Sequence, residues 1–139
     1  MQQQISVITL GIADLPRSRH FYGTGFGWRP VFENDDIAFY QMNGFVLGTW
    51  LQDELAADSR RPASAPGNVT LAHNVAAEDQ VAPLIDRLVA AGGSLLRAAD
   101  APPYGGLRGY VADPDGHLWE IAFNPAWSID QNGRVTFGL

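Results

Sequence analysis

The stretch Asp113-Pro114-Asp115-Gly116-His117-Leu118-Trp119-Glu120 places a tight turn directly before a strand. Aspartate, proline and glycine in this order are typical of turns, and the run from His117 to Phe123 then favours a strand. Near the other end of the chain, Leu10-Gly11-Ile12-Ala13-Asp14-Leu15 closes an apolar run with an aspartate suited to cap a helix. The two stretches therefore predict a strand that leads into a helix near the start and a hairpin near the end.

Between these stretches the pattern of elements repeats once. In the first half we expect a strand at 5–12, a helix from Asp14, and strands at 29–32, 37–42 and 45–50. In the second half we expect a strand at 69–75, a helix from about Glu78, and strands at 94–98, 107–112 and 117–123. Each half is thus a βαβββ module, with module one at about 5–51 and module two at about 69–123. Residues 52–68 form a linker, and residues 124–139 form a C-terminal extension.

The repeat predicts an α+β fold of two tandem modules within a single domain spanning 1–139. It aligns Val7 with Thr70 and Gly48 with Glu120. Such modules can form open, curved sheets, a half-barrel with helices outside and a central cleft. Clefts of this kind are where small molecules tend to bind.

Composition excludes several classes of function. A chain of 139 residues with 46% apolar residues can build one compact core. The net charge of −6 argues against nucleic acid as a partner, because affinity for phosphate depends on clustered lysine and arginine. No apolar run is long enough to span a membrane, and the absence of cysteine fits a cytoplasmic location.

In the residues 10–15, in Ser18 and Phe21-Tyr22, and again in residues 113–120, the chain resembles the vicinal-oxygen-chelate superfamily. That group includes glyoxalase I, extradiol dioxygenases and bleomycin-resistance proteins. The resemblance covers Ile5 to about Phe123 and implies the paired-module fold and a homodimer. It does not imply one activity, because members of one architecture isomerise, cleave rings, open epoxides or sequester drugs.

The resemblance also implies where a metal would bind. The four ligand positions of the metal-using members fall on Val7, Gly48, Thr70 and Glu120. Glu120 is the only one with a charged donor, which is too few for a lasting divalent site. We therefore expect no metal and no cofactor.

Strand alternation directs Glu120 into the predicted cleft, and Trp50 shares a face with Gly48. Glu120, Trp50, Thr70, Gly48 and Val7 are therefore the predicted ligand-binding residues. The alternative for Glu120 is a structural partner of Arg108 or of a nearby hydroxyl. His73 alternates away from Thr70, towards the helices, which favours a core or interface role over a functional one. An acidic chain with Glu120 in its cleft should favour neutral or cationic ligands.

Three functions remain open. The first is a metal-independent protein that binds a small organic molecule between Glu120 and aromatic walls. The second is a lyase, isomerase or dioxygenase-like enzyme in which Glu120 is the catalytic base or the sole retained metal ligand. The third is an interaction protein whose cleft is vestigial. Catalysis requires a second polarising group, and Val7, Gly48 and Thr70 offer only one hydroxyl, so the binding function is favoured.

Overall fold

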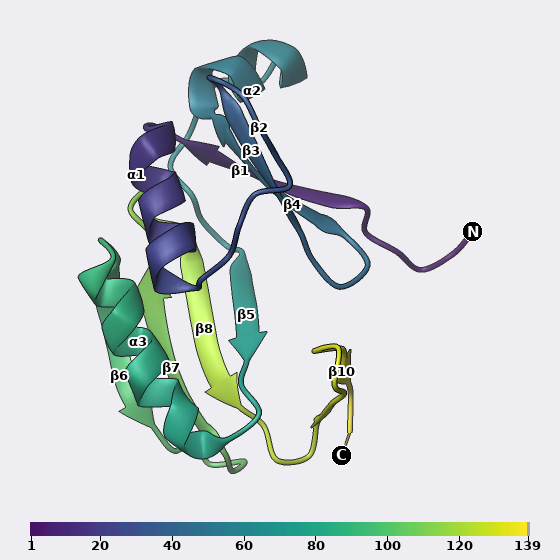
Figure 1. The fold of residues 1–139 in the computed structure, drawn as a ribbon, viewed down its shortest axis with the longest axis vertical. Coiled ribbons are helices and arrows are strands. Elements are labelled where there is room, and N and C mark those ends of the chain that lie inside the picture. Colours follow the sequence, from purple (N-terminus) through teal and green to yellow (C-terminus); the bar gives the residue numbers. More distant parts are fainter. Residues whose placement is uncertain (139) are drawn as a thin grey trace.

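The computed structural model describes residues 1–138 and contains two similar βαβββ modules, one above the other in Figure 1. Module one consists, in chain order, of β1 (Val7–Ile12), α1 (Leu15–His20), the π-helical segment η1 (Phe21–Gly25), β2 (Phe32–Glu33), β3 (Ile37–Gln41) and β4 (Val46–Leu51). Module two consists of β5 (Thr70–Asn74), the 3-10 turn η2 (Glu78–Gln80), α3 (Val81–Ala90), β6 (Ser94–Asp100), β7 (Leu107–Ala112) and β8 (Leu118–Phe123). The predicted α+β fold and order of elements are confirmed.

Each module contributes one open four-stranded sheet, and the two sheets have the same topology. Their strand orders are β1-β4-β3-β2 and β5-β8-β7-β6, with the first and last strands of each module parallel. Thr9 is paired with Gly48 in the first sheet, and Ala72 is paired with Glu120 in the second. Because these pairs are equivalent, the alignment of Gly48 with Glu120 in the sequence repeat is correct.

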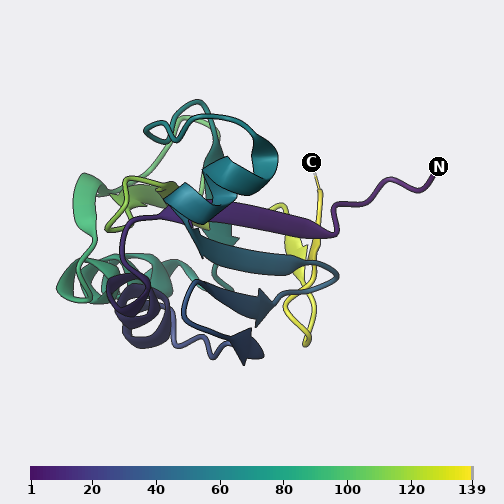
Figure 2. The same cartoon turned by 90° about the horizontal axis from the view of Figure 1, so that it is seen from above.

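Both main helices lie on the same side of the molecule, each packed against its own sheet (Figures 1 and 2). Asp14 caps α1 as predicted, because its carboxylate accepts the Arg17 backbone N–H at 2.7 Å. The segment η1 then turns Phe21 and Tyr22 into the core, where both are fully buried. A Cβ atom on Gly25 would lie 2.8 Å from the side chain of Leu88, so glycine allows η1 to approach α3 closely.

Two local predictions differ from the structure. The strand expected at 29–32 is reduced to a short β2 that begins at Phe32, because Pro30 precedes it and only two residues pair with β3. The linker 52–68 begins with a helix, α2 (Gln52–Ser59), that has no buried residue. An apolar stripe is the main sequence signal of a surface helix, so α2 left no periodicity to detect.

The two stretches of sequence that predict the fold bind each other across the module boundary. The Asp115 carboxylate accepts the Ala13 backbone N–H and a guanidinium N–H of Arg17, each at 2.8 Å. The His117 Nε2 atom lies 2.7 Å from the Gly11 carbonyl oxygen, which can only accept, so His117 donates. The turn before β8 is therefore one of the places where the two modules are in contact.

A buried hydrogen-bond network at the same turn reaches into the shared core. The Tyr22 hydroxyl donates to Asp113 Oδ2 at 2.7 Å and accepts from the Trp119 indole at 3.2 Å. Asp113 Oδ1 accepts the backbone N–H groups of Asp115 and His117 at 2.9 and 2.8 Å. Burial, followed by the charge of Asp113, raises the pKa of Tyr22 well above its usual value, so the phenol stays protonated and donates.

The chain continues beyond module two into a small C-terminal hairpin made of β9 (Ser128–Ile129) and β10 (Val135–Thr136). Figures 1 and 2 both place this hairpin beside the β3–β4 turn. A Cβ atom on Gly133 would lie 3.0 Å from the Asn43 side chain, which confirms that the two turns are neighbours. Within residues 1–138, no helix has the length and apolar character needed to cross a membrane.

Candidate functional site

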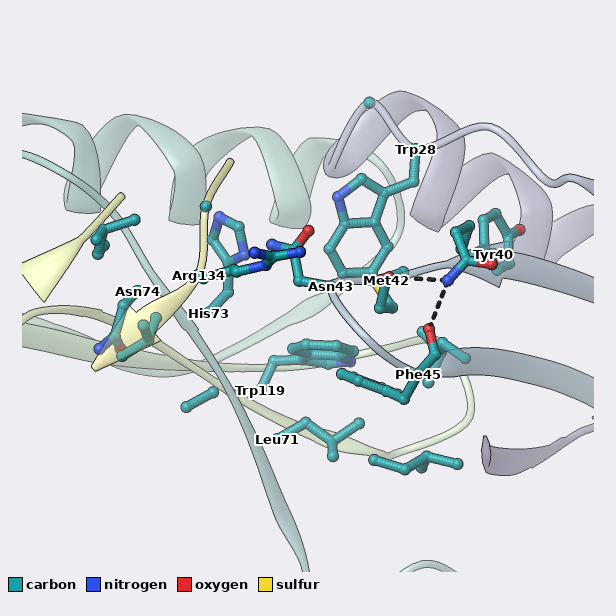
Figure 3. Close-up of a pocket in the computed structure, with 18 of the residues that line it drawn as sticks. Trp28, Tyr40, Met42, Asn43, Phe45, Leu71, His73, Asn74, Trp119 and Arg134 are labelled. Carbon is teal, nitrogen blue, oxygen red and sulfur yellow. Dashed lines mark hydrogen bonds between the residues drawn. The ribbon is translucent and has the colours of Figure 1, made fainter. Parts of the chain in front are cut away.

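A pocket with a volume of about 990 Å³ lies between the modules. It is bounded by β1, β3 and β4 of module one, by β5 and β8 of module two, and by the C-terminal hairpin (Figure 3). Most of the bulky strand residues that line it lie on the helix side of each sheet, and Gln41, Ala72 and Asn74, which alternate with them, also reach it. Strand alternation thus gives this pocket Leu47 and Trp119, and it directs Gly48 and Glu120 to the opposite faces.

Aromatic side chains form one wall of the pocket. Trp28 follows η1 and stacks on Phe26, with ring centroids 4.2 Å apart and planes within 14°. Trp119 meets Trp28 edge to face, with centroids 5.7 Å apart and planes inclined by 66°. The remaining apolar lining comes from both modules and includes Ile8, Tyr40, Met42, Phe45, Leu47 and Leu71. A flat apolar molecule can pack into the corner between the two indole rings.

His73 on β5 adds a polar group to this wall. Its ring lies edge to face with Phe26 and Trp28, at centroid distances of 5.6 and 6.1 Å. Burial lowers the pKa of His73, so the imidazole is neutral at pH 7 and can either donate or accept a hydrogen bond. Alternation correctly places His73 on the helix side, but its place in a pocket depends on the packing of module one against module two.

Polar groups gather where the pocket opens to solvent. The side chains there are Arg29, Gln41, Asn43, Asn74 and Arg134. Figure 3 shows Asn43, His73 and Arg134 directed towards the same space above Trp119. Arg134 belongs to the C-terminal hairpin, which also contributes Ile129, Gly133 and Val135 to the lining. The site thus combines an apolar interior with a polar rim, the usual composition of a small-molecule site.

The residues predicted from sequence lie elsewhere and fall into two groups on two sheets. Val7, Gly48 and Trp50 lie on the outer face of the first sheet, away from α1, and Thr70 and Glu120 lie on the corresponding face of the second. Neither the pocket between the modules nor a second pocket of about 570 Å³ beside α2 is lined by any of them. A site shared by Glu120 and Trp50 remains a prediction, and neither pocket provides it.

The missing side chain of Gly48 does not leave an empty space on the face of its sheet. A Cβ atom there would lie 3.0 Å from the ring of Phe39, so the Phe39 ring covers the space that the missing side chain leaves. Phe39 is the residue paired with Gly48 on β3. Glycine at this position therefore accommodates a neighbouring aromatic ring.

Glu120 is half-buried and lies opposite Tyr110 on β7. Burial, followed by the negative charge of Glu120, raises the pKa of Tyr110. Arg108, the other partner considered for Glu120, pairs instead with Asp100. The hydroxyl beside Glu120 is thus that of Tyr110.

The donors at the positions implied for a metal do not fit a metal site. Val7 and Gly48 offer no donor side chain, and Thr70 is paired with Leu118, two residues before Glu120. Across the described part of the chain, residues 1–138, no three His, Asp or Glu side chains are grouped as metal ligands. One carboxylate and one hydroxyl are too few for a stable divalent site.

Comparison with known proteins agrees with this architecture. Residues 4–121 match the family described as Glyoxalase/Bleomycin resistance protein/Dioxygenase superfamily. A glyoxalase-related enzyme from Fulvimarina pelagi is 65% identical, covers 99% of this chain and 100% of its own, and superposes with a TM-score of 0.97. A lactoylglutathione lyase from Agrobacterium tumefaciens is 20% identical over 94% of this chain and 100% of its own, with a TM-score of 0.72. The latter likeness concerns the fold alone.

Paired βαβββ modules with equivalent sheets place the molecule in the class of tandem-module α+β proteins. The family match extends over most of both modules, and the chain belongs to the glyoxalase, bleomycin-resistance and dioxygenase superfamily. The matched range ends at residue 121, so the C-terminal hairpin that lines the pocket lies outside the family pattern.

Proposed function

We propose that the protein binds a small organic molecule, without a metal, in the pocket between the modules. The observation that carries this proposal is the pocket itself: about 990 Å³ in volume, walled by Trp28 and Trp119, with His73 in the wall and the other polar side chains at the rim. Volumes of this order are typical of sites that enclose a small ligand, and apolar walls supply most of the affinity there.

Metal independence rests on the chemistry of the available donors. Glu120 is the one charged group at the positions implied for a metal, and it lies outside the pocket. Ligand binding should therefore be unchanged after the protein has been treated with a chelator and dialysed. Elemental analysis of the purified protein should find no stoichiometric divalent ion.

The binding site can be located with two single substitutions in one experiment. A thermal-shift screen of small aromatic compounds identifies ligands, and titration calorimetry then measures their dissociation constants. Leu71→Trp adds bulk inside the pocket and should weaken binding tenfold or more, about 1.4 kcal/mol. Glu120→Gln keeps the side-chain shape at the site predicted from sequence and removes its charge. This substitution should leave the dissociation constants of the same ligands unchanged.

The reverse pattern would support the site predicted from sequence. If Glu120→Gln weakens binding tenfold and Leu71→Trp does not, the ligand lies against the second sheet, where Glu120 could also act as a base. Asn43→Trp, at the exposed rim, blocks the entrance without altering the core and serves if Leu71→Trp fails to fold.

We also propose that the protein is a homodimer. Leu95 and Leu96 on the edge strand β6 are 52% and 57% exposed, and Phe32 on the opposite module is 52% exposed. An edge strand with exposed apolar side chains can pair with another chain, which covers those side chains. Light scattering at micromolar concentration should therefore give twice the chain mass of 15.1 kDa, and a single species at the chain mass would contradict the proposal.

A further inference from the structure

The rim of the pocket carries positive charge in a protein that is negative overall. The chain has a net charge of −6, yet the pocket lining contains Arg29 and Arg134 and no aspartate or glutamate. Net charge influences long-range attraction, whereas the groups that touch a ligand decide which charge it can carry. The local charges therefore favour an anion, the opposite of the preference expected from overall charge and Glu120.

Neither arginine takes part in an ion pair within residues 1–138. The four ion pairs in this part of the chain use Arg17, Arg19, Arg97 and Arg108. Asp130 lies in the same turn as Arg134, and its Oδ1 atom accepts the backbone N–H groups of Asn132 and Arg134 at 2.8 and 2.9 Å. These backbone hydrogen bonds, more than the charge of Arg134, lower the pKa of Asp130. Neither Asp130 nor any other aspartate or glutamate lines the pocket, so no carboxylate there competes with a ligand for Arg29 and Arg134.

The shape of the pocket restricts the rest of the ligand. Trp28 and Trp119 form a corner of two inclined rings below the rim, and Phe26 supports Trp28 from behind. Figure 3 shows Arg134 and Asn43 above Trp119 and beside Trp28, and both residues are exposed. A ligand that fills the site must therefore have a flat apolar part for the corner and a polar part for the rim.

We infer that the pocket takes an aromatic carboxylic acid, with its ring packed against the corner that Trp28 and Trp119 form and its carboxylate on the guanidinium of Arg134. This inference rests on the binding function proposed above and assigns the chemical class of the ligand. A planar guanidinium can donate two parallel hydrogen bonds to the two oxygens of a ligand carboxylate. A ligand with an amide has only one such oxygen, and a ligand with an ammonium group has none. Arg29 adds a second positive charge at the same rim.

The inference is tested with three probes of similar size: naphthoate, its neutral amide naphthamide, and the cation naphthylmethylammonium. Titration calorimetry on the full chain should show that naphthoate binds at least tenfold more tightly than naphthamide, with the cation weakest. Arg134→Gln should weaken naphthoate about tenfold and leave naphthamide unchanged. Added salt should reduce the difference between acid and amide, because the contact lies near solvent.

The matched control is Arg60→Gln, which removes the same charge from an exposed arginine outside both pockets. It should change neither dissociation constant. Equal affinity for acid and amide, tighter binding of the cation, or an equal effect of Arg60→Gln and Arg134→Gln would each overturn the inference. If naphthamide binds in the pocket as well as the acid, the proposed binding function stands and the inference fails. If no probe and no screened compound binds, both fail.

Discussion

Replacement of Asp113 by alanine is expected to lower the free energy of unfolding by about 3 kcal/mol. Asp113 does not line the pocket, so this loss concerns stability and not ligand contact. Asp113 is 3% exposed, and its carboxylate accepts three hydrogen bonds, from Tyr22 and from the backbone of Asp115 and His117. The substitution leaves these donors without an acceptor in the core. It also loosens the turn whose other contacts join module two to Gly11, Ala13 and Arg17 of module one.

Urea denaturation followed by circular dichroism measures this loss, and two further variants show its origin. Tyr22→Phe removes one of the three hydrogen bonds to Asp113 and the bond from the Trp119 indole, and it should cost about 1–2 kcal/mol. Asp86→Ala replaces an exposed aspartate in α3 and should be neutral or slightly stabilising, because alanine is the better helix former. The double variant of Asp113 and Tyr22 should lose less than the sum of the single losses, because the two side chains share a bond. A loss below about 1 kcal/mol for Asp113→Ala would show that the network does not stabilise the fold.

The order of elements could be predicted because each element leaves a local signal. Asp14 caps α1, and Asn43-Gly44 turns β3 into β4 with Gly44 at a φ of 96°. The turn before β8 likewise requires glycine at position 116, where φ is 92°. In each case, the chemistry of one or two residues decides the backbone conformation, so the sequence alone is sufficient.

The site could not be predicted in the same way because it depends on how the modules pack. Strand alternation correctly places the side chains of Glu120 and Trp119 on opposite faces of the sheet. It does not indicate which of these faces contacts the other module. The assumption that Glu120 and Trp50 face one cleft came from the symmetry of the repeat. The pocket between the modules lies on the helix side, where the residues after η1 bring Phe26 and Trp28 against His73. A site shared by Glu120 and Trp50 stays a prediction.

The local sequence pattern also could not predict that the C-terminal hairpin lines the pocket. β9 and β10 contain two residues each, too few for alternation to show. Their place beside the β3–β4 turn depends on tertiary contacts such as that between Gly133 and Asn43. One signal was present: residues 124–139 continue after both modules are complete, and a segment outside a repeat can cover a site between its halves.

A chain that ends at Ala126 should keep its fold and lose most of its affinity for pocket ligands. The backbone hydrogen bonds of residues 127–138 are made within residues 124–138, and Trp127 packs on Phe137 of the same segment, with ring centroids 5.1 Å apart. Removing the hairpin therefore breaks few contacts with the modules. We expect the free energy of unfolding to change by less than about 1 kcal/mol.

The same truncation removes one wall of the pocket, and this distinguishes it from the loss of Arg134 alone. Ile129, Gly133, Arg134 and Val135 all leave with the hairpin, so both apolar contact and charge are lost. Naphthamide, which should not respond to Arg134→Gln, should bind the truncated chain about tenfold more weakly, and naphthoate should lose a larger factor. Calorimetry on the full and truncated chains measures both. Unchanged affinity for naphthamide would mean that the hairpin does not contact the bound ring, and that the modules alone form the apolar part of the site.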